Sequence, residues 1–204
     1  MKNKISDPKN KKNLIMVDCF GVISSQIVVD WIYEHFGKVK GKELDEKYSY
    51  LGDMGYISLF EYASEMAKLV GEDPHELYWK WINSAIINFE LIKMLQKLRK
   101  EAIVVIASNA SKGLVEDVFK SKNVDKNKFD HIFLSYKFHK VKPHLDFYQY
   151  IISSFDQNFD HIYMIDDRKI NLEKIHELGV IPILFKDNNK LKEDIKTHFK
   201  ENID

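Results

Sequence analysis

Short apolar runs that end in polar side chains recur along this chain. The first covers residues 14–17 and is followed by Asp18. The later runs have the same form, with Ser108 and Asn109 after residues 102–107, Ser135 and then Lys142 after residues 132–134, and Asp166 and Asp167 after residues 162–165. Runs of four to six apolar residues rich in Val and Ile are typical of buried strands in parallel sheets. Because the carboxyl ends of parallel strands lie along one edge, we expect these polar side chains to converge there.

Helical patterns separate the apolar runs in the second half of the chain. They cover residues 89–100, 113–122, 145–153 and 171–178, and a last apolar run follows at residues 181–185. Alternation of strands and helices is typical of a parallel sheet with helices on both faces. The sequence therefore predicts an α/β fold with a doubly wound, Rossmann-like core.

The segment between the first two strands is predicted to be all helical. Residues 28–36 and 43–51 have helical patterns, Ser58 and Glu61 form a capping box, and Asp73 precedes Pro74 as a helix N-cap would. This favours three parts: an α/β core formed by residues 14–24 and 88–186, a helical cap formed by residues 25–87, and polar terminal segments at residues 1–13 and 187–204. The charged tail from residue 186 is expected to be a peripheral helix or a partly disordered segment.

The order and spacing of the strand-end residues resemble the four motifs of the haloacid dehalogenase-like (HAD) hydrolase superfamily. Those motifs are a nucleophilic Asp, a Ser or Thr, a Lys often followed by Pro, and an acidic pair; here the positions hold Asp18, Ser108, Lys142 and Asp166–Asp167. The resemblance runs from about residue 14 to about residue 185. It implies a hydrolase of the helical-cap subgroup, but the motifs are not specific for a substrate.

Asp18 and Lys142 are the candidate catalytic residues. A carboxylate is a weak nucleophile in water and becomes effective when it is desolvated and aligned against phosphorus or carbon. Lys142 would offset the negative charge of the substrate and of Asp18. The resemblance assigns substrate contacts to the residues Cys19, Phe20, Ser108 and Asn109. Helix capping by Asn109 and a buried, inert thiol at Cys19 are the structural alternatives.

The acidic residues at the sheet edge favour a cation site. Asp18, Asp166 and Asp167 would bring like charges together, which raises their pKa values or requires a cation. Carboxylate oxygens and water suit Mg²⁺. We expect Asp18 and Asp167 to bind the metal directly and Asp166 through water, and the resemblance adds the backbone carbonyl of Phe20. Asn171 could orient this acidic loop or cap its own helix.

Phe20 stands where phosphatases of this superfamily carry a second Asp, the general acid and base. Loss of such a group costs ~10²–10⁴-fold in rate. Three interpretations follow: a Mg²⁺-dependent phosphatase of a small phosphomonoester, with a good leaving group or an acid from elsewhere; a non-catalytic binding or regulatory protein; and a 2-haloacid dehalogenase-type hydrolase. The acidic pair and Lys142 favour the phosphatase. Phe20 fits the dehalogenase, which needs no metal, but the usual arginine after the first motif is absent.

Composition narrows the classes of partner. The 204 residues contain 31 Lys and Arg and 31 Asp and Glu, so the net charge is zero, which argues against a nucleic-acid binder. No apolar run approaches the ~20 residues of a membrane span, and the polar N-terminus lacks the apolar core of a signal peptide. One cysteine excludes an internal disulfide and fits a reducing compartment. We expect a cytoplasmic protein acting on a small, phosphorylated substrate.

Overall fold

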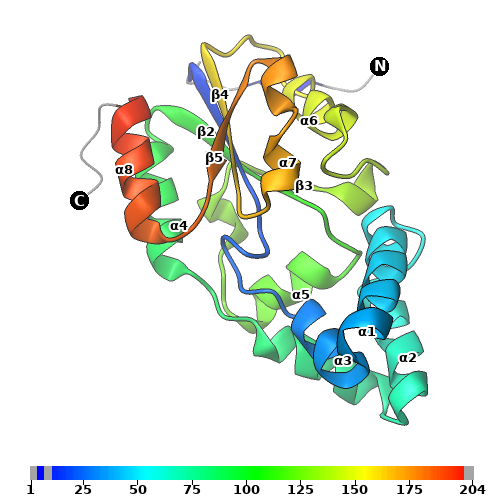
Figure 1. The fold of residues 1–204 in the computed structure, drawn as a ribbon. Helices are drawn as coiled ribbons and strands as arrows, with labels where there is room; N and C mark the ends of the chain where they lie inside the picture. Colours follow the sequence, from blue (N-terminus) through cyan, green and yellow to red (C-terminus); the bar gives the residue numbers. More distant parts are fainter. Residues whose placement is uncertain (1–3, 7–10, 200–204) are drawn as a thin grey trace.

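A computed structural model describes residues 4–6 and 11–199 of the chain (Figure 1). Its centre is a five-stranded parallel sheet in the order β3-β2-β1-β4-β5. The strands are β1 (Asn13–Val17), β2 (Ala102–Ser108), β3 (His131–Leu134), β4 (His161–Asp166) and β5 (Val180–Leu184). Each overlaps one of the five predicted apolar runs, and no bound differs by more than one residue.

The strand order places β1 and β4 at the point where the chain reverses direction across the sheet. From β1 the chain moves to β2 and β3, and then returns to place β4 on the other side of β1. In open α/β sheets, ligands bind at the carboxyl ends of the strands at this switch point. Asp18 follows β1 directly, and β4 ends in Asp166. The topology therefore puts these two carboxylates at the position where a ligand is expected.

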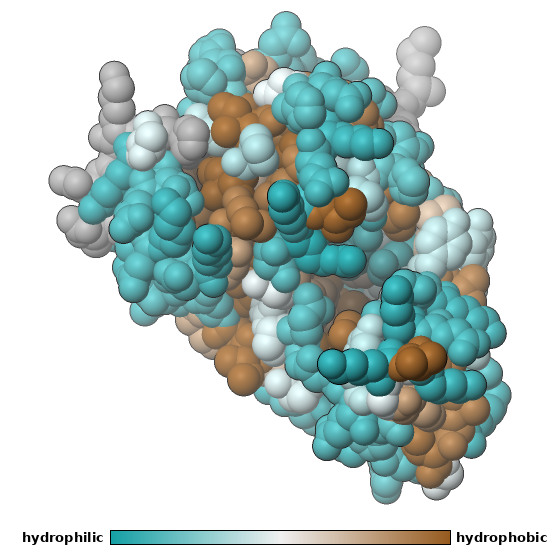
Figure 2. Space-filling view, in the orientation of Figure 1, coloured by the Kyte–Doolittle hydropathy of each residue, from teal (hydrophilic) through white to brown (hydrophobic). Residues whose placement is uncertain are grey.

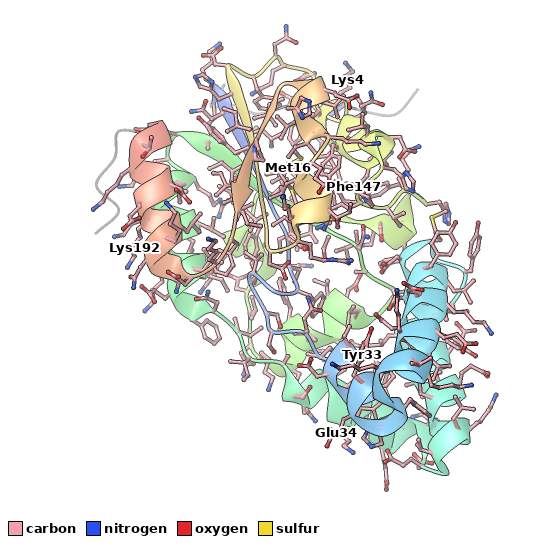
Figure 3. The ribbon with its side chains drawn as sticks, in the orientation of Figure 1. Lys4, Met16, Tyr33, Glu34, Phe147 and Lys192 are labelled. Carbon is pink, nitrogen blue, oxygen red and sulfur yellow. The ribbon has the colours of Figure 1, made fainter. Side chains whose placement is uncertain are left out.

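Helices cover both faces of the sheet, as predicted for a doubly wound fold. The alternating side chains of β1 separate into two apolar clusters, because successive residues of a strand point to opposite faces. One face packs against α4 (Phe89–Leu98), α5 (Leu114–Ser121) and α8 (Asn188–Phe199), and the other against α6 (Leu145–Ile152) and α7 (Lys169–Leu172). Figure 3 shows Met16 of β1 beside Phe147 of α6 in the second cluster.

The segment between β1 and α4 holds three helices, α1 (Val29–Asp53), α2 (Leu59–Val70) and α3 (Pro74–Ser84), which we call the helical insertion. It lies at one end of the molecule in Figure 1. The two predicted N-caps are present: Ser58 and Glu61 form a reciprocal capping box, and the Asp73 side chain accepts hydrogen bonds from two backbone N–H groups. The first two predicted helices are the halves of α1, which is interrupted at Gly37 (φ 68°, ψ −179°).

The structure tests two predictions near the C-terminus, the helix at residues 171–178 and the charged tail that follows residue 185. The helix predicted at residues 171–178 is instead the short α7 followed by a 3₁₀ helix, Ile175–Leu178. The charged tail forms α8, and its Leu191 and Ile195 are buried against the sheet. The other 3₁₀ helices are Lys126–Lys128 and Ser135–Lys137. Of the predicted polar terminal segments, residues 1–3, 7–10 and 200–204 lie outside the described residues.

The molecular surface is mixed in character. In Figure 2, hydrophilic side chains cover α8, and hydrophobic ones gather beside it over β5. β5 is an edge strand that contains Pro182, and proline discourages further strand pairing because it lacks an N–H donor. Among the described residues, no helix combines the length and apolar character needed to cross a membrane.

Candidate active site

Asp18 is held at the end of β1 by the backbone of its neighbours. Its N–H donates to the carbonyl of Ile165 on β4 at 2.9 Å, which continues the strand pairing by one residue. One carboxylate oxygen, Oδ1, accepts the backbone N–H of Cys19 at 2.7 Å. Burial raises the pKa of Asp18 to about 7, although the nearby Lys142 opposes that rise. The carboxylate is therefore desolvated and has a fixed orientation.

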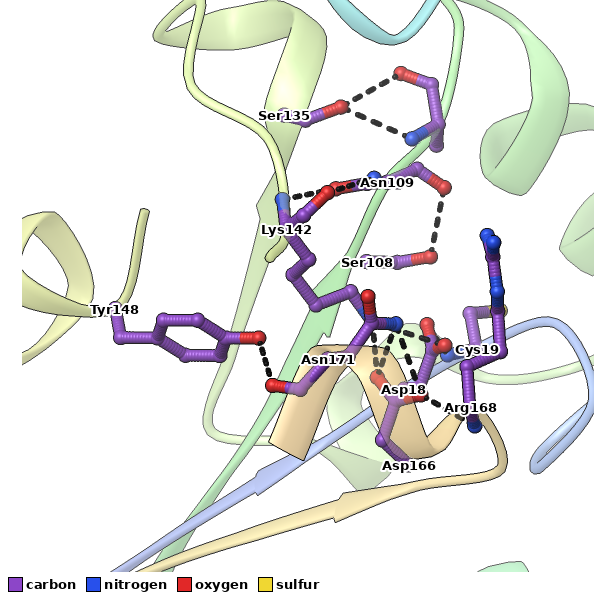
Figure 4. A network of polar contacts seen from close by, with 11 residues as sticks. Asp18, Cys19, Ser108, Asn109, Ser135, Lys142, Tyr148, Asp166, Arg168 and Asn171 are labelled. Atoms are coloured by element: carbon purple, nitrogen blue, oxygen red, sulfur yellow. Dashed lines mark hydrogen bonds and ion pairs between the residues drawn. The ribbon is translucent and has the colours of Figure 1, made fainter. Parts of the chain in front are cut away.

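Lys142 lies between two carboxylates at the sheet edge (Figure 4). Its Nζ is 2.8 Å from Oδ2 of Asp18 and 2.6 Å from Oδ2 of Asp166, and the residue is 4% exposed. Burial lowers the pKa of Lys142, but the charges of the two carboxylates outweigh that effect and hold the pKa above its usual value. Lys142 is thus a permanent cation rather than a base.

Asp166 is fully buried, and protein donors occupy both its oxygens. Besides the ammonium of Lys142, it accepts hydrogen bonds from the Asn171 side chain at 3.0 Å to each oxygen and from the Arg168 backbone N–H. The Asn171 carbonyl in turn accepts a hydrogen bond from the hydroxyl of Tyr148 at 2.6 Å. Asn171 therefore orients the acidic loop, which was one of the two roles expected for it.

Asp167 has different surroundings from its neighbour. Its Oδ1 is buried and, among the described residues, has no hydrogen-bond partner. Burial, together with the charge of Asp166, raises its pKa. Oxygens of Asp18, Asp166 and Asp167 all lie within 4.8 Å of one another. Like charges at this separation repel, and only a cation or protons can relieve the repulsion.

Gly21 is needed where the loop after β1 passes Asp167. Its φ is +90°, a conformation that L side chains rarely adopt. A Cβ atom on Gly21 would lie 2.2 Å from Oδ2 of Asp167. The absence of a side chain therefore lets the loop pack directly against the carboxylate.

Ser108 and Asn109 take part in the hydrogen bonding of the core. The fully buried Ser108 hydroxyl donates to the Asn109 carbonyl at 3.0 Å. The Asn109 side chain makes two hydrogen bonds to the Lys142 backbone, accepting from its N–H at 2.8 Å and donating to its carbonyl at 3.1 Å. Asn109 lines the cavity described below and holds the segment that carries Lys142, whereas the N-cap of α5 is Gly113.

Cys19 and Phe20 differ in their access to the site. The Cys19 side chain is buried in the apolar core, and burial raises the pKa of its thiol well above its usual value. Cys19 contacts the active site through its backbone N–H, which donates a hydrogen bond to Asp18. Phe20 is 8% exposed and forms part of the cavity wall.

A cavity of about 150 Å³ lies between the strand ends and the helical insertion. The strand ends contribute Asp18, Phe20, Asn109, Lys142 and Arg168, and α1 contributes Asp45, Ser49 and Asp53. Sequence reasoning missed Asp45 and Asp53 because a charged residue on a helix usually marks a solvated face. Burial raises the pKa of Asp53 to about 7, an effect that Lys142 opposes and the charges of Asp18 and Asp45 reinforce.

A doubly wound sheet with a buried carboxylate, a lysine and an acidic pair at its switch point defines a Rossmann-like enzyme core. The chain belongs to the haloacid dehalogenase-like hydrolases, whose family model matches residues 14–179. No curated protein matches the chain in sequence.

Solved structures share this fold at low sequence identity. A HAD family enzyme from Bacteroides thetaiotaomicron is 18% identical with a TM-score of 0.73, and 94% of this chain and 100% of that chain are covered. Its complex with magnesium and inorganic phosphate gives 20% identity and a TM-score of 0.66 over 88% of this chain and 96% of that one. L-2-haloacid dehalogenase from Xanthobacter autotrophicus, with chloropropionic acid covalently bound, is 13% identical with a TM-score of 0.60, covering 95% and 85%.

Proposed function

We propose that this protein is a Mg²⁺-dependent phosphatase that hydrolyses a small phosphomonoester through an aspartyl-phosphate on Asp18. The observation that carries the proposal is the cluster of three carboxylates, in which Asp167 keeps a buried oxygen without a protein partner among the described residues. Lys142 forms ion pairs with Asp18 and Asp166, whereas among the described residues Asp167 forms none. The cluster therefore retains negative charge that a cation would neutralise.

The residues present fit a magnesium ion. Asp18, Asp167 and the backbone carbonyl of Phe20 would bind it, whereas Asp166, whose oxygens already accept protein hydrogen bonds, would act through water. When bound, Mg²⁺ would neutralise charge on the phosphoryl oxygens and on the carboxylates. The magnesium and phosphate complex of the Bacteroides thetaiotaomicron relative supports this assignment by analogy of fold.

The protein residues divide the reaction into two displacements. A carboxylate oxygen of Asp18 attacks phosphorus, and the bond to the leaving-group oxygen breaks with its electron pair going to that oxygen. Water then attacks the phosphoryl group and releases phosphate, which returns Asp18 to its carboxylate form. Lys142 stabilises negative charge in both steps. The Cys19 N–H and Asn109 maintain the positions of Asp18 and of the Lys142 segment.

A dehalogenase is the second candidate, and Phe20 is the observation that favours it. Halide leaves without a proton, so the missing general acid would cost nothing in that reaction. The fold is also similar to that of the L-2-haloacid dehalogenase from Xanthobacter autotrophicus. This candidate leaves the unpartnered oxygen of Asp167 unexplained.

The test is turnover of a panel of small phosphomonoesters, with and without Mg²⁺, beside chloride release from 2-chloropropionate. We expect Mg²⁺-dependent phosphate release from the wild-type protein and none from Asp18→Asn, because that variant lacks the nucleophile. Chloride release without phosphatase activity would establish the dehalogenase. Magnesium binding without turnover of either class would instead establish a binding or regulatory protein.

A further inference from the structure

The helical insertion contributes two carboxyl groups, Asp45 and Asp53, to the cavity that the nucleophile also lines. Asp53 is the last residue of α1, and it lines the same cavity as Asp18, Phe20 and Lys142. It is partly buried, and its pKa responds to the charges of Asp18 and Lys142. The two displacements proposed above do not use this carboxyl group, and Phe20 cannot supply the proton that an alkoxide leaving group needs.

The backbone around Asp53 is anchored to the core and not only to its own helix. The Asp53 carbonyl accepts a hydrogen bond at 2.7 Å from the hydroxyl of Ser135, which is fully buried after β3 and also accepts the Ala110 N–H. The adjacent Met54 carbonyl lies 2.6 Å from Nδ1 of His139. These contacts fix Asp53 relative to the strand ends.

Close packing of two nearby glycines, Gly52 and Gly55, reinforces that anchoring. A Cβ atom on Gly52 would lie 2.8 Å from Cβ of Ser111, so this turn of α1 approaches the core as closely as a glycine allows. Gly55, with φ +77°, similarly passes the Tyr136 carbonyl, where a Cβ would lie 2.7 Å away. The backbone on both sides of Asp53 in the sequence is therefore held in place, which limits where its side chain can reach in the cavity.

The charges around Asp53 suit both halves of an acid–base cycle. Burial raises its pKa, Lys142 and Arg168 lower it, and Asp18 and Asp45 raise it, which leaves a pKa of about 7. A group with a pKa near the working pH can give up a proton in one step and accept one in the next. An exposed carboxyl group would be ionised throughout and could not donate.

We propose that Asp53 is the general acid and base of the reaction, supplied by the helical insertion in place of the side chain that Phe20 lacks. The proposal rests on the proposed phosphatase function. As Asp18 bonds to phosphorus and the ester bond breaks, the Asp53 carboxyl gives its proton to the leaving oxygen. The resulting carboxylate then takes a proton from the water whose oxygen bonds to phosphorus. The phosphorus–Asp18 bond breaks, its electron pair returns to Asp18, and ester plus water have become alcohol plus phosphate.

The test compares Asp53→Asn with Glu46→Gln, which removes an exposed carboxylate from the same helix. For an alkyl phosphate we expect Asp53→Asn to lower kcat/KM by ~10²–10⁴-fold, because the alkoxide needs a proton as it leaves. For an aryl phosphate we expect the variant to have a lower kcat, because hydrolysis of the aspartyl-phosphate has lost its base. KM falls by the same factor, so kcat/KM is nearly unchanged. Glu46→Gln behaves as wild type with both substrates.

The wild-type pH profile provides a measurement that does not depend on how a variant folds. With saturating Mg²⁺, kcat/KM for the alkyl phosphate falls as the pH rises through the pKa of Asp53, because the carboxyl group loses its proton, and the aryl phosphate lacks this decline. Identical profiles for the two substrates, or equal losses of kcat/KM in Asp53→Asn, would overturn this role and leave the phosphatase function standing. Absence of phosphatase turnover in the wild-type protein would overturn both proposals.

Discussion

At the scale of single residues, Asp166 and Asp167 are adjacent in sequence but have opposite surroundings. Both oxygens of Asp166 accept hydrogen bonds from protein donors, whereas Oδ1 of Asp167 has no partner among the described residues. Successive residues at the end of a strand point in different directions, so one carboxylate faces the core and the other faces the loop after β1. We infer that Asp166 positions Lys142 and that Asp167 is the acid with a free ligand atom.

Gly21→Ala tests this position of Asp167. The new methyl group would collide with the carboxylate and would also hold a residue at φ +90°, a strain of about 1–3 kcal/mol. We expect Mg²⁺ affinity, measured by calorimetric titration, to fall ~10–100-fold, which is the usual cost of displacing a residue that supports a metal site. Gly71→Ala is the matched control, because Gly71 also has positive φ but has no atom within 4 Å of the added Cβ. Equal Mg²⁺ affinities in both variants would contradict the assignment.

Asp53→Asn should change how the stability of the metal-free protein depends on pH. A folded-state pKa of about 7, against 3.8 for a solvent-exposed Asp side chain, means that the folded protein holds this proton more tightly than the unfolded chain. The wild-type free energy of unfolding therefore falls as pH rises from about 4 to about 7, and Asn removes that contribution. The free energy of unfolding of Asp53→Asn, relative to that of wild type, should therefore be higher at pH 8 than at pH 4.5. We expect this increase to be on the order of 1 kcal/mol after allowance for solvent screening.

Urea unfolding at the two pH values measures this change, with Glu46→Gln as the control variant. A difference between Asp53→Asn and wild type that is the same at both pH values would show that Asp53 titrates normally. That result would also remove the electrostatic support for its catalytic role.

At the scale of elements, strong local sequence signals mark where helices of the helical insertion begin and end. α2 starts at the Ser58–Glu61 capping box and ends at Gly71, whose left-handed conformation closes the helix. α3 starts at Asp73 with Pro74 in its first turn. These signals satisfy backbone N–H groups that a helix start leaves without partners, which is why the starts of both helices could be predicted closely. α7 had no comparable start signal, and its predicted bounds were wrong.

Ser58→Ala is expected to destabilise the protein through α2 alone. The variant loses the hydrogen bond from the Glu61 N–H and the one that its own hydroxyl donates to the Glu61 carboxylate. Loss of a helix N-cap costs about 1 kcal/mol. The measurement is the urea midpoint, and Ser58→Asp, which keeps a capping oxygen, should retain most of the wild-type value. Equal midpoints for the Ala and Asp variants would contradict the capping role.

At the scale of the whole molecule, one apolar cluster runs from the sheet into the helical insertion. It joins Ile15, Val104 and Ile165 of the sheet to Trp31, Tyr62 and Trp81 of the insertion. The Tyr78 hydroxyl on α3 also donates a hydrogen bond to Asp117 on α5. The insertion that we propose as a cap, with the predicted limits 25–87, therefore has no separate core of its own.

This continuity predicts a single cooperative unfolding transition. All three tryptophans, Trp31, Trp79 and Trp81, lie in the insertion, so tryptophan fluorescence reports that part of the chain alone. Far-UV circular dichroism reports all the helices and strands. We expect urea transitions followed by the two methods to coincide, because neither part can lose its packing without exposing the shared cluster. An earlier fluorescence transition would show that the insertion unfolds independently.

The sequence by itself determined the strands and the residues at their ends. Buried parallel strands have continuous apolar runs, and the residue after each run must lie at the carboxyl edge of the sheet. Asp18 and the acidic pair could therefore be placed at one edge before their distances were known, and the resemblance to the HAD motifs added Lys142. The resemblance to the HAD superfamily follows from the same local pattern, since its motifs are defined by those positions.

Only the tertiary structure decided how the residues around this edge are used. The helix cap that Asn109 could have supplied is instead formed by Gly113, and the Asn109 side chain holds the Lys142 backbone, 33 positions further along the chain. In the sequence, Asp53 does not differ from other charged residues near helix ends. In the structure, the hydrogen bond from Ser135 to its carbonyl and the close contact of Gly52 with Ser111 place it at the cavity. Such roles depend on contacts between distant segments and on the burial that results. A short-range pattern contains neither, because both arise when the insertion packs against the strand ends.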